Sequence, residues 1–264
     1  MRTRRIIVSL VELLICVLAW AGISQSYCQG QWEEFTYFTY QTNFIVGVVY
    51  LWASIATITG GKQPWAWLRG GVLLYIFTTG LVANFILPAP DYATEYRAFG
   101  FIPNSLLVHI SVPILCLLDY VLFERHRHYR WWYPLTWPLY IYCWFVFVII
   151  RASAFPHAGV DPGSRDPYPY FFLNIPKVGW GGILKDFILF TIFFLVLGYI
   201  LYGIDKALPR TAVVPTTTLQ DLRKRAQRSK NRRIARIENQ WPRESLSPDA
   251  PTVLVQDGAP HGLD

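Results

Sequence analysis

Two residue types that act together in acyl chemistry, a threonine and a histidine, lie in separate apolar stretches of this 264-residue chain. Thr39 belongs to FTYFTYQTNF (residues 35–44), and His109 belongs to LLVHISVPILCLLDYVLF (106–123). A hydroxyl becomes a nucleophile when a base such as imidazole lies within hydrogen-bond reach and removes its proton. Both residues follow closely after the start of an apolar segment. We therefore expect them at similar depth if both segments enter a membrane from the same side.

Neither residue type identifies an active site by itself. A threonine in an apolar helix often bonds to its own helix backbone, and a lone membrane histidine is often a packing residue that is hydrogen-bonded within the bundle. The position of Pro113 adds a local expectation, because a proline four residues after His109 cannot donate a hydrogen bond to the His109 carbonyl. The sequence therefore predicts a kink in this helix and a free carbonyl beside the imidazole.

The composition is that of an integral membrane protein. Hydrophobic residues make up 53% of the chain and charged residues only 16%, against roughly 25% charged residues in soluble domains. A bilayer is crossed by ~20 apolar residues in a helix. Six stretches qualify, at about residues 6–26, 36–59, 66–87, 104–123, 132–153 and 183–203. We therefore predict an all-α polytopic membrane fold, with the first stretch retained as a helix rather than cleaved as a signal peptide.

The charges of the loops predict the orientation of the spans. Basic residues precede span 1, flank the loop between spans 2 and 3, crowd the loop between spans 4 and 5 and follow span 6, whereas the other loops are richer in acid. By the positive-inside rule, both termini face the cytoplasm. We predict a six-helix domain over residues 1–208 and a basic tail over 209–264. Residues 222–240 of that tail are expected to form a basic helix on anionic lipid headgroups, and the rest to be disordered.

Several other kinds of site and partner are not expected. Cys16, Cys116 and Cys143 lie within apolar segments and only Cys28 lies near a membrane edge, so no disulfide framework or metal-ligand spacing is visible. We expect no metal and no cofactor. The net charge of +7 comes mostly from the ends and short loops, which argues against a nucleic-acid partner. Membrane lipids are the expected partners and the cell membrane the expected location, whereas the sequence leaves the oligomeric state open.

Three segments carry a resemblance to a known family. FTYFTYQTNFIVGVVYLW (35–52), LLVHISVPILCLLDYVLF (106–123) and PYPYFFLN (167–174) occur in an order and spacing that resembles the six-span androgen-induced membrane hydrolases. The chain looks closest to the bacterial relatives of that family. The resemblance covers roughly residues 6–205, and it implies a six-helix membrane fold.

The resemblance also implies a chemistry. In the animal members of the family, a threonine early in span 2 and a histidine in span 4 hydrolyse fatty-acid esters of hydroxy fatty acids. By position, these residues correspond to Thr39 and His109 in this chain. Thr36 and Thr42 are alternatives for the threonine, because each lies within about one helical turn of Thr39. The activity itself belongs to the animal branch.

The same interpretation predicts the lining of a polar pocket that opens toward the outer leaflet. Gln41 and Asn43 are candidate oxyanion donors, and the loop between spans 5 and 6 is expected to roof the pocket. Bacterial relatives often have a histidine and an acid where this chain has two asparagines, which weakens the case for a third catalytic residue. The expected lining residues are Gln41, Thr42, Asn43, Asn84, Tyr168, Tyr170 and Asn174.

Three classes of function remain after this reading. An intramembrane lipid ester hydrolase is preferred, and a non-catalytic membrane scaffold or regulator is the alternative. A transporter is disfavoured because no inverted repeat and no paired glycine or proline break is evident. Glu12 and Asp119 would belong to a proton path in a transporter, but helix packing explains them more simply. Arg151 and Asp186 lie at the outer ends of spans 5 and 6, and we expect Arg151 either to form an ion pair with Asp186 or to extend to lipid phosphates.

Overall fold

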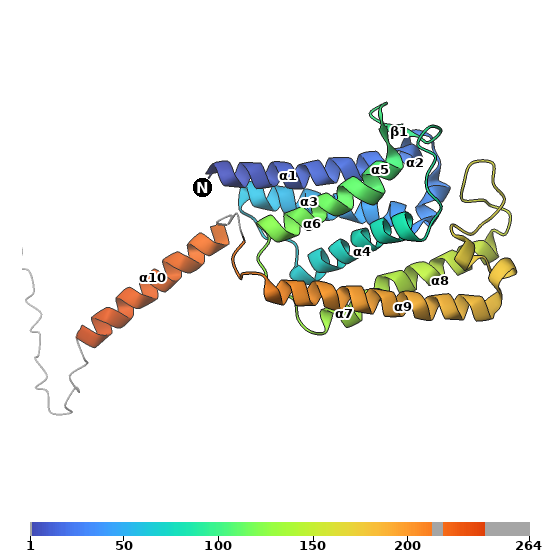
Figure 1. The fold of residues 1–264 in the computed structure, drawn as a ribbon. Helices are drawn as coiled ribbons and strands as arrows, with labels where there is room; N and C mark the ends of the chain where they lie inside the picture. The colour runs from blue at the N-terminus through green and yellow to red at the C-terminus, as the bar shows by residue number, and fades with distance from the viewer. Residues whose placement is uncertain (1, 213–218, 241–264) are drawn as a thin grey trace, which may run out of the picture. The chain divides into compact units, whose positions relative to one another are not determined.

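A computed structural model describes residues 2–212 and 219–240 of the chain. Six helical segments in these ranges are long and apolar enough to cross a membrane, which confirms the predicted all-α fold with six transmembrane helices (Figure 1). These segments are Thr3–Gly22, Phe38–Thr59, Ala66–Phe85, Asn104–Phe123, Tyr133–Ala154 and Ile175–Ala207. The chain therefore has the helices of a multi-pass membrane protein, and the orientation of its termini stays a prediction from the loop charges.

Short elements interrupt or connect these spans. The α-helices are α1 (Arg2–Gly22), α2 (Ser24–Cys28), α3 (Phe38–Thr59), α4 (Ala66–Phe85), α5 (Asn104–Leu106), α6 (Val112–Phe123), α7 (Tyr133–Thr136), α8 (Pro138–Ala154), α9 (Ile175–Ala207) and α10 (Leu219–Gln240). The remaining elements in the described ranges are two 3₁₀ turns (Trp32–Thr36 and Phe171–Leu173), a π-helical turn (Leu107–Ser111) and the antiparallel strands β1 (Arg97–Ala98) and β2 (Ile102–Pro103).

The helices form a bundle in which α1 lies along α3, and α4 and α6 pack against that pair, while α8 and α9 lie on the far side of α4 (Figure 1). The seam between α1 and α3 uses small and polar groups. The hydroxyls of Ser9 and Ser54 lie 2.9 Å apart, and Gly47 leaves room for the indole of Trp20, with which a methyl group at this position would overlap. In lipid the hydrophobic effect does not drive helices together, so they associate through close packing at small residues and through interhelical hydrogen bonds.

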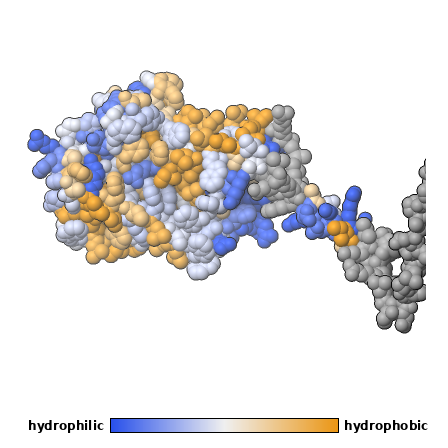
Figure 2. All heavy atoms as spheres, turned by 180° about the vertical axis from the view of Figure 1, so that it is seen from behind, coloured by the Kyte–Doolittle hydropathy of each residue, from blue (hydrophilic) through white to orange (hydrophobic). Residues whose placement is uncertain are grey.

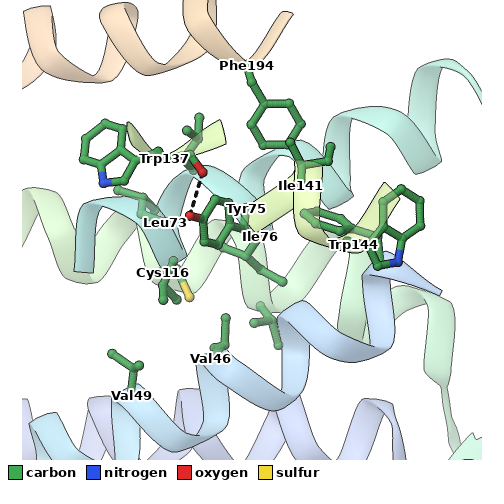
Figure 3. Packing of buried hydrophobic residues seen from close by; sticks show 14 of the residues in the cluster. Val46, Val49, Leu73, Tyr75, Ile76, Cys116, Trp137, Ile141, Trp144 and Phe194 are labelled. Carbon is green, nitrogen blue, oxygen red and sulfur yellow. Dashed lines mark hydrogen bonds between the residues drawn. The ribbon is translucent and has the colours of Figure 1, made fainter. Parts of the chain in front are cut away.

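The interior of the bundle is filled by aromatic and aliphatic side chains from every major helix. Tyr75 of α4 lies at its centre, among Val46 of α3, Cys116 of α6 and Phe194 of α9 (Figure 3). The Tyr75 hydroxyl is buried and donates a hydrogen bond of 2.8 Å to the carbonyl of Trp137, which starts α8 (Figure 3). This bond satisfies a polar group that lipid could not satisfy.

The outside of the bundle is apolar as well, and large apolar side chains show in broad patches on the face drawn in Figure 2. The last span is the clearest case, because only 17% of the residues in its most apolar stretch are buried. Leu184, Ile188, Ile192 and Val196 are all about half exposed along α9. Such a surface is stable only against lipid or another apolar partner.

The sixth span begins earlier than the sequence predicts. Its expected start is about residue 183, but α9 begins at Ile175 and continues to Ala207. Asn174 precedes the helix, and its side chain accepts a hydrogen bond from the Lys177 amide. Gly179 then interrupts the helical backbone with a φ of 65°, which only glycine adopts without strain. The glycine-rich stretch therefore forms a capped first turn and a kink rather than an irregular loop.

The C-terminal part forms a separate compact unit from Gln220 onward. A basic helix was predicted at residues 222–240, and α10 (Leu219–Gln240) confirms that this stretch is helical. The side chains of residues 226–236 are exposed. The predicted disorder of the rest of the tail concerns mainly residues 213–218 and 241–264, which lie outside the described residues. The binding of anionic lipid by this helix stays a prediction.

Candidate functional site

The span that carries His109 is distorted at that residue, in line with the position of Pro113. Residues Leu107–Ser111 form a π-helical turn between α5 and α6. The carbonyl of His109 is not free, however, because it accepts a hydrogen bond of 3.2 Å from the side-chain amide of Asn84 on α4. π-helical turns inside α-helices are frequent at functional sites. Pro113 thus removes one backbone hydrogen bond to the His109 carbonyl, and the side chain of Asn84 on the neighbouring helix supplies another.

The closeness of α4 to this turn depends on Gly80. A methyl group at Gly80 would lie 2.9 Å from the His109 carbonyl oxygen, which is too close for an ordinary side chain. Asn84 lies one turn further along α4 and also donates a hydrogen bond of 2.8 Å to the Gly80 carbonyl. Asn84 is exposed at the edge of the bundle and lies outside the cavity described next. Its observed role is to hold α4 against the π-helical turn.

A cavity of about 30 Å³ lies between α3, α4, α8, α9 and the loop that precedes α9. One water needs ~10–15 Å³ on this measure, so the space holds roughly two waters. Thr39, Thr78, Thr79 and Tyr170 are hydroxyl-bearing residues of a wall whose surface is almost entirely apolar. The apolar lining residues are Phe38, Val82, Leu87, Ile141, Trp144, Phe172 and Phe190.

Thr39 and Tyr170 meet at this cavity. Thr39 is on the first turn of α3, with 7% of its surface exposed. Tyr170 reaches it from the loop between α8 and α9. Burial raises the pKa of the Tyr170 hydroxyl to about 12, and hydrogen bonding with the Thr39 side chain acts in the opposite direction. Tyr170 is therefore a neutral phenol that faces the Thr39 hydroxyl, as expected for a residue that roofs the pocket.

His109 lies on the other side of Thr79. Its imidazole interacts with the backbone of Thr79, and its Nδ1 atom is buried without a hydrogen-bond partner. His109 is not among the residues that line the cavity. No hydrogen bond joins Thr39 to His109 among the residues that the structure describes. Thr79 therefore contacts both the cavity that Thr39 lines and the imidazole of His109.

The hydroxyl of Thr79 belongs to a short network with α3. It lies 3.1 Å from the Thr42 hydroxyl and donates a hydrogen bond of 3.0 Å to the Tyr75 carbonyl. Thr42 also donates to the Thr39 carbonyl at 3.1 Å. Asn43 donates to that same carbonyl at 2.9 Å, while its Oδ1 atom is buried without a partner. Thr42 and Asn43 thus support the first turn of α3 from behind the cavity wall.

Gln41 and Thr36 have contacts of their own near the start of α3. The Gln41 amide donates to the Phe35 carbonyl at 2.7 Å and accepts from the Tyr140 hydroxyl at 2.9 Å. The Thr36 carbonyl accepts a hydrogen bond of 3.0 Å from the Trp144 indole. Neither Gln41 nor Thr36 lines the cavity. These contacts fasten the entry of α3 to α8.

The loop before α9 is organised by Asp166. The Asn174 side chain donates to both carboxylate oxygens of Asp166, at 3.1 and 2.9 Å, and the Tyr168 amide donates to the same carboxylate. Asn174 and Tyr168 lie outside the cavity. They shape the segment that presents Tyr170, so their observed role is to position the loop.

The predicted pair between Arg151 and Asp186 is wrong. The Arg151 guanidinium donates instead to the backbone carbonyls of the loop after α8, those of Ala158, Gly159 and Pro167. Asp186 has its ion pair with the adjacent Lys185, at 3.7 Å. An arginine has five donors, and those of Arg151 are directed at several loop carbonyls rather than at one carboxylate.

Thr78 and Thr79 are cavity residues that the sequence analysis did not select. Both are buried, and the Thr78 hydroxyl has no hydrogen-bond partner. The signal was present as adjacent threonines before Gly80 in an otherwise apolar span. Comparisons of the chain with protein-family models, with curated proteins and with solved structures find no match. The case for a function therefore rests on the residues and their geometry.

Proposed function

We propose that this chain hydrolyses a lipid ester inside the membrane, with Thr39 as the nucleophile and His109 as the base. The observation that carries the proposal is the position of Thr39, which lines a small and mostly apolar cavity. Pockets of this composition suit apolar ligands that a few polar atoms orient. The resemblance of residues 35–52 and 106–123 to a hydrolase family assigns chemistry to the same two residues.

His109 has a nitrogen available for the role of a base. Its Nδ1 atom is buried and has no partner, so it accepts a proton without first losing a hydrogen bond. Catalytic hydrogen bonds are often long or absent in empty sites and form only with substrate. Under the proposal, substrate binding displaces Thr79 and brings the Thr39 hydroxyl within ~3 Å of the imidazole.

The reaction would proceed in two steps. The Thr39 oxygen attacks the ester carbonyl while His109 takes its proton, and the resulting tetrahedral oxyanion collapses to an acyl-threonine as His109 protonates the leaving alcohol. Water then attacks the acyl-threonine, with His109 again as base, and releases the fatty acid. Tyr170 and Thr78 are the donors proposed for the oxyanion, because both residues line the cavity and the Thr78 hydroxyl has no hydrogen-bond partner.

The size of the cavity limits what binds without rearrangement. A space of about 30 Å³ accommodates water but no acyl chain. Most of its wall belongs to long transmembrane helices, whereas Tyr170 and Phe172 belong to the loop before α9 and its 3₁₀ turn. We therefore place substrate entry at this loop, which would move outward to admit an acyl chain from the outer leaflet.

Labelling with a fluorophosphonate, which traps activated hydroxyls, tests the proposal. The full chain in lipid nanodiscs should be labelled, and mass spectrometry should place the adduct on Thr39. Thr39→Ala and His109→Ala should each abolish labelling without loss of expression. The double variant should be no worse than either single variant, because the two residues act as a unit.

Two further threonines on or beside the first turn of α3 supply matched controls. Thr36→Ala should leave labelling intact, because Thr36 lies outside the cavity. Thr42→Ala tests the alternative nucleophile, since the Thr42 hydroxyl is hydrogen-bonded to Thr79. Undiminished labelling of Thr39→Ala with loss in Thr42→Ala would move the nucleophile to Thr42. Labelling that persists in both variants would reject a threonine hydrolase.

A second candidate, a non-catalytic membrane scaffold or regulator, is supported by one specific observation. Thr39 and His109 share no hydrogen bond in the described structure, and Gln41, Asn84 and Asn174 are all engaged in structural contacts. This role predicts no probe adduct on any threonine. Lipid analysis of cells with and without the protein separates the two functions, since only the hydrolase changes the ratio of lipid ester to free fatty acid.

A further inference from the structure

A second polar site lies inside the bundle, away from the threonine cavity. The guanidinium of Arg69, near the start of α4, forms ion pairs with three carboxylates. Its Nη2 atom lies 2.5 Å from Asp119 of α6, its Nε atom 2.7 Å from Glu124 at the end of that helix, and its Nη1 atom 3.5 Å from Glu12 of α1. Ten residues of α4, about 15 Å of helix, separate Arg69 from Thr79. The cluster is therefore distinct from the candidate active site.

The cluster is almost completely buried. The exposed fraction of the side chain is 9% for Arg69, 3% for Glu12, 0% for Asp119 and 13% for Glu124. Two carboxylate oxygens, Glu12 Oε2 and Asp119 Oδ1, are buried and have no hydrogen-bond partner. An ionised oxygen in this situation loses its hydration without full compensation, which is strongly unfavourable. The hydroxyls of Thr57 and Tyr50 lie near Glu12 and Asp119, respectively, and neither carries a positive charge.

The charges in the cluster do not balance. Three ionised carboxylates and one guanidinium carry a net charge of −2. Glu12, Asp119 and Glu124 all form their ion pairs with the same guanidinium, that of Arg69. Arg5 is the basic residue of α1 nearest in sequence, but its guanidinium donates to the backbone carbonyls at the end of α3. Carboxylates that share a buried site cannot all stay ionised, because their repulsion is only weakly screened there.

We propose that this cluster is a proton-binding site, which holds at least one proton between Glu12 and Asp119 at neutral pH. The geometry selects these two residues because Arg69 binds one oxygen of each and leaves the other oxygen without a partner. A proton on either oxygen converts an unsatisfied acceptor into a hydroxyl donor and reduces the net charge to −1. The ligand of the site is thus a proton.

Other titratable groups face the cluster from the surrounding helices. Tyr50 of α3 covers the guanidinium, with 5.4 Å between Arg69 Cζ and the centre of the ring. Cys116 lies on the preceding turn of α6, next to Tyr50 and Asp119. Asp205 of α9 faces Glu124, but it is already engaged by the amides of residues 127 and 129. None of these groups supplies the missing positive charge.

Glu124 extends the site toward the end of the bundle. Burial raises the pKa of this carboxyl above its usual range, against the opposing charge of Arg69. Glu124 caps the end of α6 beyond the last residue of the span, so it is the member of the cluster closest to water. Under the proposal, Glu124 is the member of the cluster through which protons from water reach Glu12 and Asp119.

Infrared spectroscopy of the full chain in nanodiscs tests the site directly. The wild-type protein at pH 7 should show the carbonyl band of a protonated carboxylic acid, shifted in heavy water and lost at high pH. The difference spectrum between the wild type and Asp119→Asn, and between the wild type and Glu12→Gln, should contain this band. The exposed Glu33 provides the control, because Glu33→Gln should leave the band unchanged. Absence of the band from the wild-type protein at pH 7 would overturn the proposal.

Thermal stability gives a second readout. An amide resembles a protonated carboxyl in shape and charge, so Glu12→Gln should melt within about 2 °C of the wild type at pH 7. Arg69→Gln should melt far lower, because it leaves buried carboxylates without their partner. A melting temperature that rises with sodium concentration at constant pH, with no protonated carboxyl band, would assign the site to a metal cation instead. That result would also overturn the proposal.

Discussion

The side chain of Asn84 donates a hydrogen bond to the backbone carbonyl of His109, 3.2 Å away on the neighbouring span. Pro113 makes this bond necessary, because without a backbone amide at position 113 the His109 carbonyl has no helical donor four residues later. The Asn84 side chain therefore links the π-helical turn to α4, in addition to the contact between the His109 imidazole and the Thr79 backbone. The candidate base lies on that turn, so its position depends on this contact.

Asn84→Ala should destabilise the protein by about 1 kcal/mol, the usual value for a hydrogen bond between uncharged groups. Pro113→Ala restores an amide that can donate to the His109 carbonyl. The loss in the free energy of unfolding caused by Asn84→Ala should therefore be smaller in a protein that also carries Pro113→Ala. Thermal unfolding of the two single variants and the double variant measures this coupling. Strictly additive effects would show that Asn84 does not replace the missing backbone bond.

Arg151 should contribute to stability and Asp186 should not. Arg151→Met keeps most of the apolar stem but removes the donors to the carbonyls of Ala158, Gly159 and Pro167, so we expect a loss of about 1–3 kcal/mol. Asp186→Asn is the matched control, because its ion pair with Lys185 is exposed on the lysine side and exposed pairs contribute little. Equal losses of stability in Arg151→Met and Asp186→Asn, measured by thermal unfolding, would contradict this assignment.

Glu34 should make stability depend on pH near the start of α3. Burial raises the pKa of this carboxyl, while hydrogen bonds from Ser26 and Tyr40 act in the opposite direction. The folded chain therefore binds more protons at Glu34 than the unfolded chain between the unfolded pKa, about 4.3, and the raised value. The free energy of unfolding contributed by Glu34 is fully present below that window and is lost as pH rises through it.

The comparison of Glu34→Gln with the wild type isolates this effect. The stability of Glu34→Gln relative to the wild type should rise with pH across the window, because the amide does not ionise. Glu33 is the exposed neighbour, and Glu33→Gln should keep the pH dependence of the wild type. Melting temperatures measured at a series of pH values between about 4 and 8 test this prediction. A difference in melting temperature between Glu34→Gln and the wild type that stays constant over this range would contradict it.

The spans are predictable from the sequence because a helix in lipid needs a continuous apolar surface to satisfy its backbone. The exception is the start of α9, where GWGG resembles a loop. There Asn174 caps the helix and the backbone bends at Gly179. Each effect depends on a single residue, which an average of hydropathy over many residues does not detect. The prediction of a distorted helix at His109 succeeded for the opposite reason, since proline acts on one identifiable carbonyl.

The arrangement of the site is much less predictable. Residue types indicated Thr39, His109 and Tyr170, and the structure brings Thr39 and Tyr170 together. It also places Thr79 beside the imidazole of His109. This contact could be predicted only if it were known which face of α4 points into the bundle. In a soluble helix the polar face reports that orientation. In a membrane span, apolar residues cover both faces, so rotation about the helix axis leaves little trace in the sequence.

Tyr170 offers the sharpest test of how the cavity works in the proposed hydrolase. Tyr170→Phe keeps the ring, which packs edge-on against Tyr37 and Trp144, and removes only the hydroxyl that faces Thr39. If that hydroxyl stabilises the oxyanion, the rate of fluorophosphonate labelling should fall about 10²-fold or more, while the melting temperature stays close to that of the wild type. Tyr168→Phe is the matched control, because Tyr168 is on the same loop but outside the cavity, and it should label at the wild-type rate. Equal labelling of both variants at wild-type rate would remove Tyr170 from the reaction and leave it as a packing residue at the roof of the cavity.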